Sequence, residues 1–180
     1  LHYQKNRSYL QDDPEALLML ECRAHSKENL LTKIKELQTC IQNETEAYAF
    51  PLIKEADIPL IFELRKAGLG LLSLVKGDKK PVACVEDTAV ALDDFADYIE
   101  EFSAAMQKYD QQAVYYAHAG AGELHIRPKI NLKDADEVKN MASLAYDITL
   151  LVKKYNGSIS GEHGDGQLRA SFLPELLGST

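Results

Sequence analysis

A short run of small residues, Ala-Gly-Ala-Gly at 119–122, separates two strand-like segments of this chain. The segments are 113–117 and 123–127, and the second alternates strictly between polar and apolar side chains. A glycine-rich connection between two such runs favours a chain reversal. We therefore predict a β-hairpin, and a connection this short joins strands that pair in the antiparallel direction.

The hairpin would bring two histidines together. A fully extended chain would hold His118 and His125 about 23 Å apart, whereas a reversal lets both imidazoles share one ion. After the turn, His125 and Arg127 fall on one face of the strand, and Leu124 and Ile126 fall on the other. The apolar pair can therefore face a core while the polar pair faces a site.

Hydrophobic periodicity predicts the other elements. Ser26 is a candidate N-cap for the first helix, and Asn156-Gly157 fits a left-handed cap at the end of the last one. Gly68 and Gly70 are expected to interrupt the second helix. The run 16–22 would suit a helix as well as a strand. The predicted helices are 29–40, 57–66, 93–109 and 134–155, and the predicted strands are 16–22, 46–53, 81–85 and the hairpin.

This order predicts an α+β fold with a mainly antiparallel sheet, helices packed on one face and a ferredoxin-like arrangement. The length of 180 residues fits a single domain over 1–180. In the long helices, the residues expected to point inward are Phe95, Ile99, Phe102 and Met106 in the third, and Val138, Met141, Leu144, Ala145, Ile148 and Val152 in the fourth.

The composition limits the classes of partner and the cellular setting that we expect for this chain. A net charge of −8 makes nucleic acid an unexpected ligand. Three cysteines without a CxxC motif argue against a disulfide framework, and we expect buried thiols in a reducing compartment. No apolar run approaches the ~20 residues that span a bilayer. The chain does not begin with Met, so we expect it to be processed or excised from something longer.

A second glycine-rich stretch, GSISGEHGDG at 157–166, supplies a carboxylate and a third histidine. His118, His125 and Glu162 together form a His₂-carboxylate set of the kind that holds a catalytic Zn²⁺. The alternative is a pair of partly exposed hairpin histidines and an unrelated surface glutamate. His163 would then lie beside the ion as a general base, or else be an ordinary loop histidine.

Two further groups have open roles. Arg65 stands near a predicted helix end and can bind a carboxylate through two hydrogen bonds, or be a solvated surface arginine. Glu86 and Asp87 can form a pair of site carboxylates, or be acids at the end of a strand. No GxGxxG motif follows a strand and no Walker motif occurs, so we expect no nucleotide site within these 180 residues.

The two histidine motifs, HAGAGELHIRP and GSISGEHGDGQLR, resemble the C-terminal half of the FAD-linked oxidases of the vanillyl-alcohol-oxidase type. That group includes D-lactate dehydrogenase, the glycolate oxidase D subunit and D-2-hydroxyglutarate dehydrogenase. The segment FELRKAGLGLL resembles the WxLR segment of the family, with Phe62 in place of tryptophan, and VEDTAVALDDFADYIEEF resembles its strand-to-helix passage. In form, this sequence is most similar to the large members of the family, in which the flavin part is fused to an iron–sulfur part.

The resemblance implies roles for particular residues. His118, His125 and Glu162 would hold a divalent metal, Zn or Mn. His163 would take the proton of the substrate hydroxyl, and Arg65 would bind the substrate carboxylate. Glu162, His163 and Gly164 would face the flavin. Besides Phe62, two further positions depart from the family pattern: Val85 is nearest to where some members have a lysine, and Ala91 stands where proline is usual.

The resemblance also implies a function. The chain would be the substrate and metal domain of an FAD-dependent enzyme that oxidises a D-2-hydroxy acid, lacking the FAD-binding domain and the closing C-terminal segment, and inactive alone. An iron–sulfur cluster or an electron-acceptor partner would lie elsewhere. The expected location is cytoplasmic, with peripheral membrane association through such a partner. The alternative is a non-catalytic α+β module that binds or senses a small acid.

Overall fold

The computed structural model describes residues 3–178 and divides the chain into two compact units, Leu1–Leu69 and Gly70–Thr180. The expectation of one domain across 1–180 stays a prediction. No helix in the described part of the chain is long and apolar enough to cross a membrane.

The first unit contains a short 3₁₀ helix, η1 (Lys5–Arg7), the helix α1 (Lys27–Glu44) and most of α2 (Ile58–Leu72). The predicted cap of α1 is confirmed, because the Ser26 hydroxyl accepts a hydrogen bond from the Asn29 amide. The predicted interruption of α2 at Gly68 and Gly70 is wrong. Glycine weakens a helix by about 1 kcal/mol relative to alanine but does not by itself end it.

Two predicted strands in the first unit are also wrong. In the described residues, 16–22 and 46–53 form irregular chain without strand pairing. The Leu17 and Leu18 side chains are 62% and 67% exposed, so the apolar run does not enter the core of this unit. A strand satisfies its backbone through a neighbouring strand, and an apolar run does not show where that neighbour is.

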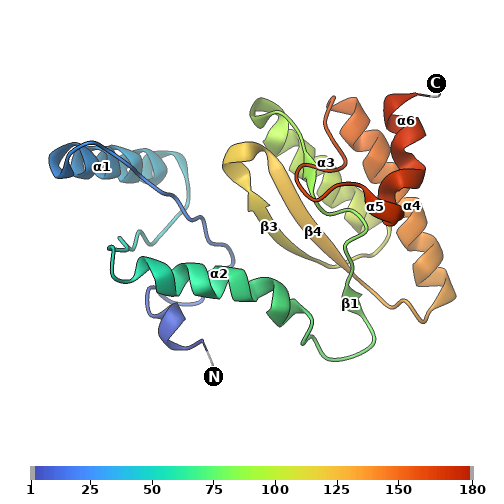
Figure 1. Cartoon of the computed structure of the whole chain (residues 1–180), viewed down its shortest axis with the longest axis horizontal. Helices are drawn as coiled ribbons and strands as arrows, with labels where there is room; N and C mark the ends of the chain where they lie inside the picture. Colours follow the sequence, from blue (N-terminus) through green and yellow to red (C-terminus); the bar gives the residue numbers. More distant parts are fainter. Residues whose placement is uncertain (1–2, 179–180) are drawn as a thin grey trace. The chain divides into compact units, whose positions relative to one another are not determined.

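The second unit holds the predicted α+β core, and the fold class is confirmed. The strand β4 (Glu123–Ile130) pairs with three others, all antiparallel. The long helices α3 and α4 lie on one face of this sheet (Figure 1). The other bounds are β1 (Lys80–Pro81), β2 (Thr88–Ala89), α3 (Phe95–Lys108), β3 (Ala113–His118) and α4 (Ala135–Lys154).

The predicted strand 81–85 is shorter than expected. Strand pairing covers Lys80–Pro81, the Val82 amide still donates to the Pro128 carbonyl, and pairing resumes only in β2. The break has a local cause: the chain bends at 84–85, and Asp87 beyond the bend is left-handed with φ 71°, so strand pairing cannot run on from β1 to β2.

The core of the second unit follows the predicted stripes, with one exception. Phe102 and Met106 of α3 are buried, and Phe95, Ile99 and Met141 are partly buried against the same cluster. Each fully buried side chain of this size stabilises the fold by about 1.5–3 kcal/mol. Val138, in the first turn of α4, is exposed instead. The buried members from β4 and α4 are Leu124, Ile126, Ile130, Leu144, Ala145, Ile148 and Val152.

After the end of α4 the chain turns and returns to the sheet. Asn156 is left-handed with φ 51°, and the Gly157 amide donates to the Val152 carbonyl, which confirms the predicted cap. Ser158 then exchanges two backbone hydrogen bonds with Ala89 of β2. This bridge places the glycine-rich loop 158–166 beside the hairpin. Three short helices follow: α5 (Gly166–Arg169), η4 (Ala170–Phe172) and α6 (Leu173–Leu177).

Candidate metal centre and active site

The hairpin turn is built as the sequence predicts. A 3₁₀ turn, η3 (Ala119–Ala121), leads to Gly122, which is left-handed with φ 67°. A Cβ at Gly122 would lie 2.1 Å from the Val90 carbonyl oxygen, so only glycine fits without displacement. The reversal brings the rings of His118 and His125 to a centroid distance of 5.3 Å.

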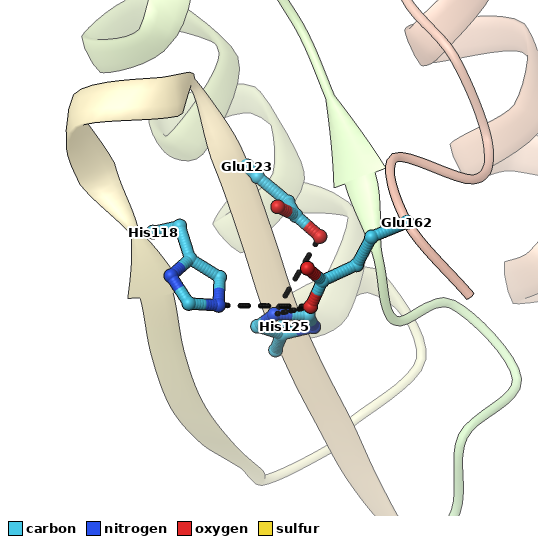
Figure 2. Close-up of side chains that lie close together, drawn as sticks. All are labelled: His118, Glu123, His125 and Glu162. Atoms are coloured by element: carbon cyan, nitrogen blue, oxygen red, sulfur yellow. Dashed lines mark ion pairs between the residues drawn. The ribbon is translucent and has the colours of Figure 1, made fainter. Parts of the chain in front are cut away.

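Glu162 reaches both histidines from the glycine-rich loop. Its Oε1 atom lies 3.6 Å from His118 Nε2 and 3.5 Å from His125 Nε2 (Figure 2). The three side chains come from two segments nearly forty residues apart in sequence. Their predicted convergence is confirmed.

Glu123 is a fourth member of the cluster that the sequence reasoning missed. It is buried, and its Oε1 atom lies 3.6 Å from His125 Nε2. That oxygen has no hydrogen-bond partner among the described residues. The sequence contains a signal for it, because Glu123, His125 and Arg127 stand at every second position and therefore lie on one face of the strand.

The cluster fits a divalent cation. One ligand atom from each of His118, Glu123, His125 and Glu162 lies within 4.8 Å of all the others. Ligands about 2.1 Å from a tetrahedral ion are about 3.4 Å apart, close to the contacts of 3.5 and 3.6 Å observed here. A cation would also give the orphaned Glu123 oxygen a partner. Two imidazoles and two carboxylates suit Zn²⁺ or Mn²⁺.

Burial and charge favour the ligand form of His125. Its side chain is 2% exposed, and burial lowers its pKa, with the nearby His163 and His118 lowering it further. The neutral imidazole is the form that binds metals. The His118 and Glu162 side chains are 40% and 48% exposed, so the cluster is closed on the His125 side and open on the other. An open side is typical of a catalytic metal site.

Asp87 holds the loop that carries Glu162 and His163. Its fully buried carboxylate accepts hydrogen bonds from Ser160 Oγ at 2.7 Å and from the amides of Glu162 and His163 at 2.9 Å each. The sequence suggested a role for Asp87 only as one of two possibilities. The structure shows that the Asp87 carboxylate fixes the conformation of the loop through these hydrogen bonds.

The carboxyl groups of Asp87 and Glu123 also interact. Burial alone would raise the pKa of Asp87, but hydrogen bonds from Glu123, the His163 amide and Ser160 hold it well below its ordinary value. Burial raises the pKa of Glu123 to about 7, and the hydrogen bond to Asp87 adds to that effect. These opposite directions favour the negative charge on Asp87 over Glu123. A bound cation would favour the ionised form of Glu123 instead.

Arg169 closes the loop from the other side. It is buried, and its Nη1 donates to the carbonyls of Glu86 and Ile159, while its Nη2 donates to the Gly164 carbonyl. Such a buried arginine also balances the charge of Asp87, which lies 3.6 Å from Nη2. The loop is thus fixed at both ends although it is rich in glycine.

His163, Gly164 and Arg65 are the remaining predicted site residues. His163 Nε2 is 3.3 Å from Glu162 Oε1, so the proposed base is next to the cluster. Gly164 is left-handed with φ 78°, and a Cβ there would meet nothing within 4 Å, so this part of the loop borders open space. Arg65 lies on α2, in the first unit. Its role in substrate binding and the flavin-facing role of the loop stay predictions.

Comparison with known proteins gives one family. Residues 2–180 match the family model for FAD linked oxidases, C-terminal domain. The chain is 31% identical over 177 residues to D-2-hydroxyglutarate dehydrogenase of Pseudomonas putida, covering 94% of this chain and 18% of that protein. It is 32% identical over 185 residues to the enzyme of the same name from Haemophilus influenzae, covering 95% and 18%.

A more distant relative is the glycolate oxidase subunit GlcD of Bacillus subtilis, 27% identical over 136 residues, with coverage of 76% of this chain and 26% of that protein. The chain therefore spans less than one fifth of the length of the first two relatives and about a quarter of the third.

Proposed function

Because this chain belongs to the FAD-linked oxidases, through their C-terminal domain, we propose that it is the substrate- and metal-binding part of an FAD-dependent oxidoreductase. The substrate is a D-2-hydroxy acid of the lactate, glycolate or 2-hydroxyglutarate class, as the names of the similar proteins suggest. The FAD-binding domain, and any iron–sulfur or electron-acceptor partner, lies outside these residues. The proposed location is cytoplasmic.

One observation carries the proposal: His118, His125 and Glu162 converge with the buried Glu123 on a single point beside His163. These four side chains would hold the divalent ion. When bound, the ion would polarise the substrate 2-hydroxyl as a Lewis acid, and the flavin would accept the hydride from C2. The protein supplies the positioning.

The residues of this chain have distinct tasks in that reaction. His163 receives the hydroxyl proton at Nε2, the nitrogen that faces Glu162 at 3.3 Å. Arg65 binds the substrate carboxylate through its guanidinium group. Asp87 and Arg169 keep the loop in place, so that His163 needs no rearrangement before it accepts the proton. Gly164 leaves room for the flavin ring to approach.

The test is flavin reduction in a longer chain that includes the FAD-binding domain. Adding D-lactate, glycolate or D-2-hydroxyglutarate should bleach the flavin absorbance, and a chelator should stop the bleaching. Zn²⁺ or Mn²⁺ should then restore it in the parent protein but not in His118→Ala. The matched control is His25→Ala, which alters an exposed histidine outside the cluster. Binding of the acid without any flavin reduction would favour the non-catalytic, small-acid-binding module.

A further inference from the structure

Glu86 is a buried carboxylate that the proposed ligand set does not use. Its residue is 6% exposed and lies directly before Asp87 in the sequence. The two carboxylate oxygens face different partners: Oε2 lies 2.5 Å from Arg127 Nε, and Oε1 lies 3.4 Å from His163 Nδ1. A buried charge of this kind is costly unless it is paired, so both contacts matter for its position.

Glu86 is held at its carboxylate and at its backbone. Arg127 Nε forms an ion pair with Oε2 but donates its hydrogen bond to the Tyr116 hydroxyl at 3.0 Å, so Oε2 has no hydrogen-bond partner among the described residues. The position of Arg127 follows from the hairpin, since it is two residues after His125 on the same face of β4. At the backbone, the Glu86 carbonyl accepts from the buried Arg169. The carboxylate therefore presents Oε1 to His163 from a fixed frame.

The ring of His163 is fixed in a complementary way. It stacks on His125 with centroids 5.2 Å apart and an interplanar angle of 21°. His125 in turn stacks on Tyr116 at 4.8 Å and 24°. Stacking sets the plane of the His163 ring, but it does not determine which nitrogen carries the proton. That choice depends on the acceptor that faces each nitrogen.

Glu86 is the available acceptor on the Nδ1 side. Asp87 Oδ2 lies farther away, at 3.9 Å from His163 Nδ1. Both Asp87 oxygens already accept hydrogen bonds from the loop: Oδ1 from the Glu162 amide, and Oδ2 from Ser160 and the His163 amide. On the opposite side of the ring, Nε2 faces Glu162 Oε1 at 3.3 Å. Glu162 Oε1 is one of the proposed ligand atoms, and an ion bound there would occupy it, which would leave Glu86 as the acceptor that faces a proton on Nδ1 of His163.

We propose that Glu86 is the positioning residue of the base: it accepts a hydrogen bond from Nδ1–H of His163 and so presents an unprotonated Nε2 to the substrate, while Arg127 holds Glu86. This inference rests on the proposed function, in which His163 receives the substrate proton. The same logic applies to metal-ligating histidines whose second nitrogen is oriented by a carboxylate, where loss of that partner typically costs about 10–100-fold in activity or metal affinity.

The test is nuclear magnetic resonance of the Zn²⁺-loaded 180-residue chain labelled with ¹⁵N-histidine, at about pH 8, above the ordinary imidazole pKa of about 6.5. Two-bond ¹H–¹⁵N correlations identify the tautomer of each ring. We expect His163 to carry its proton on Nδ1 in the parent chain and to shift toward the Nε2–H form in Glu86→Ala. Glu86→Gln keeps an acceptor oxygen and should preserve Nδ1–H. The control is Glu101→Ala on α3, which alters a partly exposed carboxylate paired with Lys154 of α4.

An Nε2–H ring for His163 in the parent chain would overturn the inference, and this outcome needs no variant to fold. An unchanged Nδ1–H tautomer in a folded Glu86→Ala chain would overturn it too. Metal titration of the same samples reports on the proposed metal site separately. A chain that binds Zn²⁺ but shows the wrong tautomer refutes only the role of Glu86, whereas a folded chain that binds no Zn²⁺ refutes the metal site on which the inference rests.

In the flavin-containing longer chain, Glu86→Ala should lower kcat about 10–100-fold with little change in KM, because Glu86 touches His163 rather than the substrate.

Discussion

Single buried carboxylates determine the geometry of this site. Asp87 is fully buried, holds two amides and a hydroxyl of the loop, and is favoured over Glu123 to carry the negative charge. The sequence identified His118, His125, Glu162 and His163, because histidine and glycine patterns are visible along the chain. It left the role of Asp87 open, because hydrogen bonds to residues more than seventy positions away leave no local pattern.

At this scale we predict that Asp87→Asn destabilises the chain by about 1–3 kcal/mol, because the asparagine NH₂ would face an amide donor and leave it unsatisfied. The free energy of unfolding, measured with denaturant, checks this. The control is Asp147→Asn, which breaks a pair with the largely exposed Lys108. That pair should contribute no more than about 1 kcal/mol. Equal, small effects for both variants would show that Asp87 does not hold the loop.

At the scale of elements, the sequence correctly predicted the helices and strands that have a strong periodic pattern of their own. The hairpin, α3 and α4 repeat apolar residues at the period of their own structure, and each was found. The strands expected at 16–22 and 46–53 were not, because an apolar run cannot specify its pairing partner. The strand at 81–85 was shorter for a different reason: the chain bends at 84–85 and leaves the pairing with β4 there.

The hairpin turn offers the sharpest element-scale prediction. Gly122→Ala should destabilise the chain by more than 1 kcal/mol, since alanine is strained at φ 67° and its Cβ would clash with the Val90 carbonyl. It should also weaken metal binding by displacing His118 from His125. Gly120→Ala is the matched control in the same turn, because its Cβ would meet nothing within 4 Å. Identical melting temperatures for the two variants would contradict this account of the turn.

At the scale of the whole molecule, the chain combines two units with different proposed tasks. The second unit, Gly70–Thr180, contains the complete ligand cluster and the proposed base. The first unit contributes Arg65 on α2. In the proposed function the flavin chemistry belongs to a part of the protein outside these residues, and the chain covers less than one fifth of the similar dehydrogenases.

Arg65→Ala tests the contribution of the first unit. In the longer, flavin-containing chain it should raise KM for the D-2-hydroxy acid by an amount corresponding to the loss of about 1.5–3 kcal/mol, the value of a hydrogen bond to a charged group. Lys66→Ala, at the next position of the same helix, should leave KM unchanged. A lowered melting temperature with an unaltered KM would identify Arg65 as a structural residue.

The central claim is that one divalent ion binds where the hairpin meets the loop. Isothermal titration calorimetry of the chelator-treated 180-residue chain with Zn²⁺ measures this directly, and Mn²⁺ provides a second ion. We predict one ion per chain, affinity lost in His118→Ala and in Glu162→Ala, and affinity unchanged in His25→Ala. Equal binding by all of these proteins, or no binding by the folded parent chain, would contradict the metal-centred account.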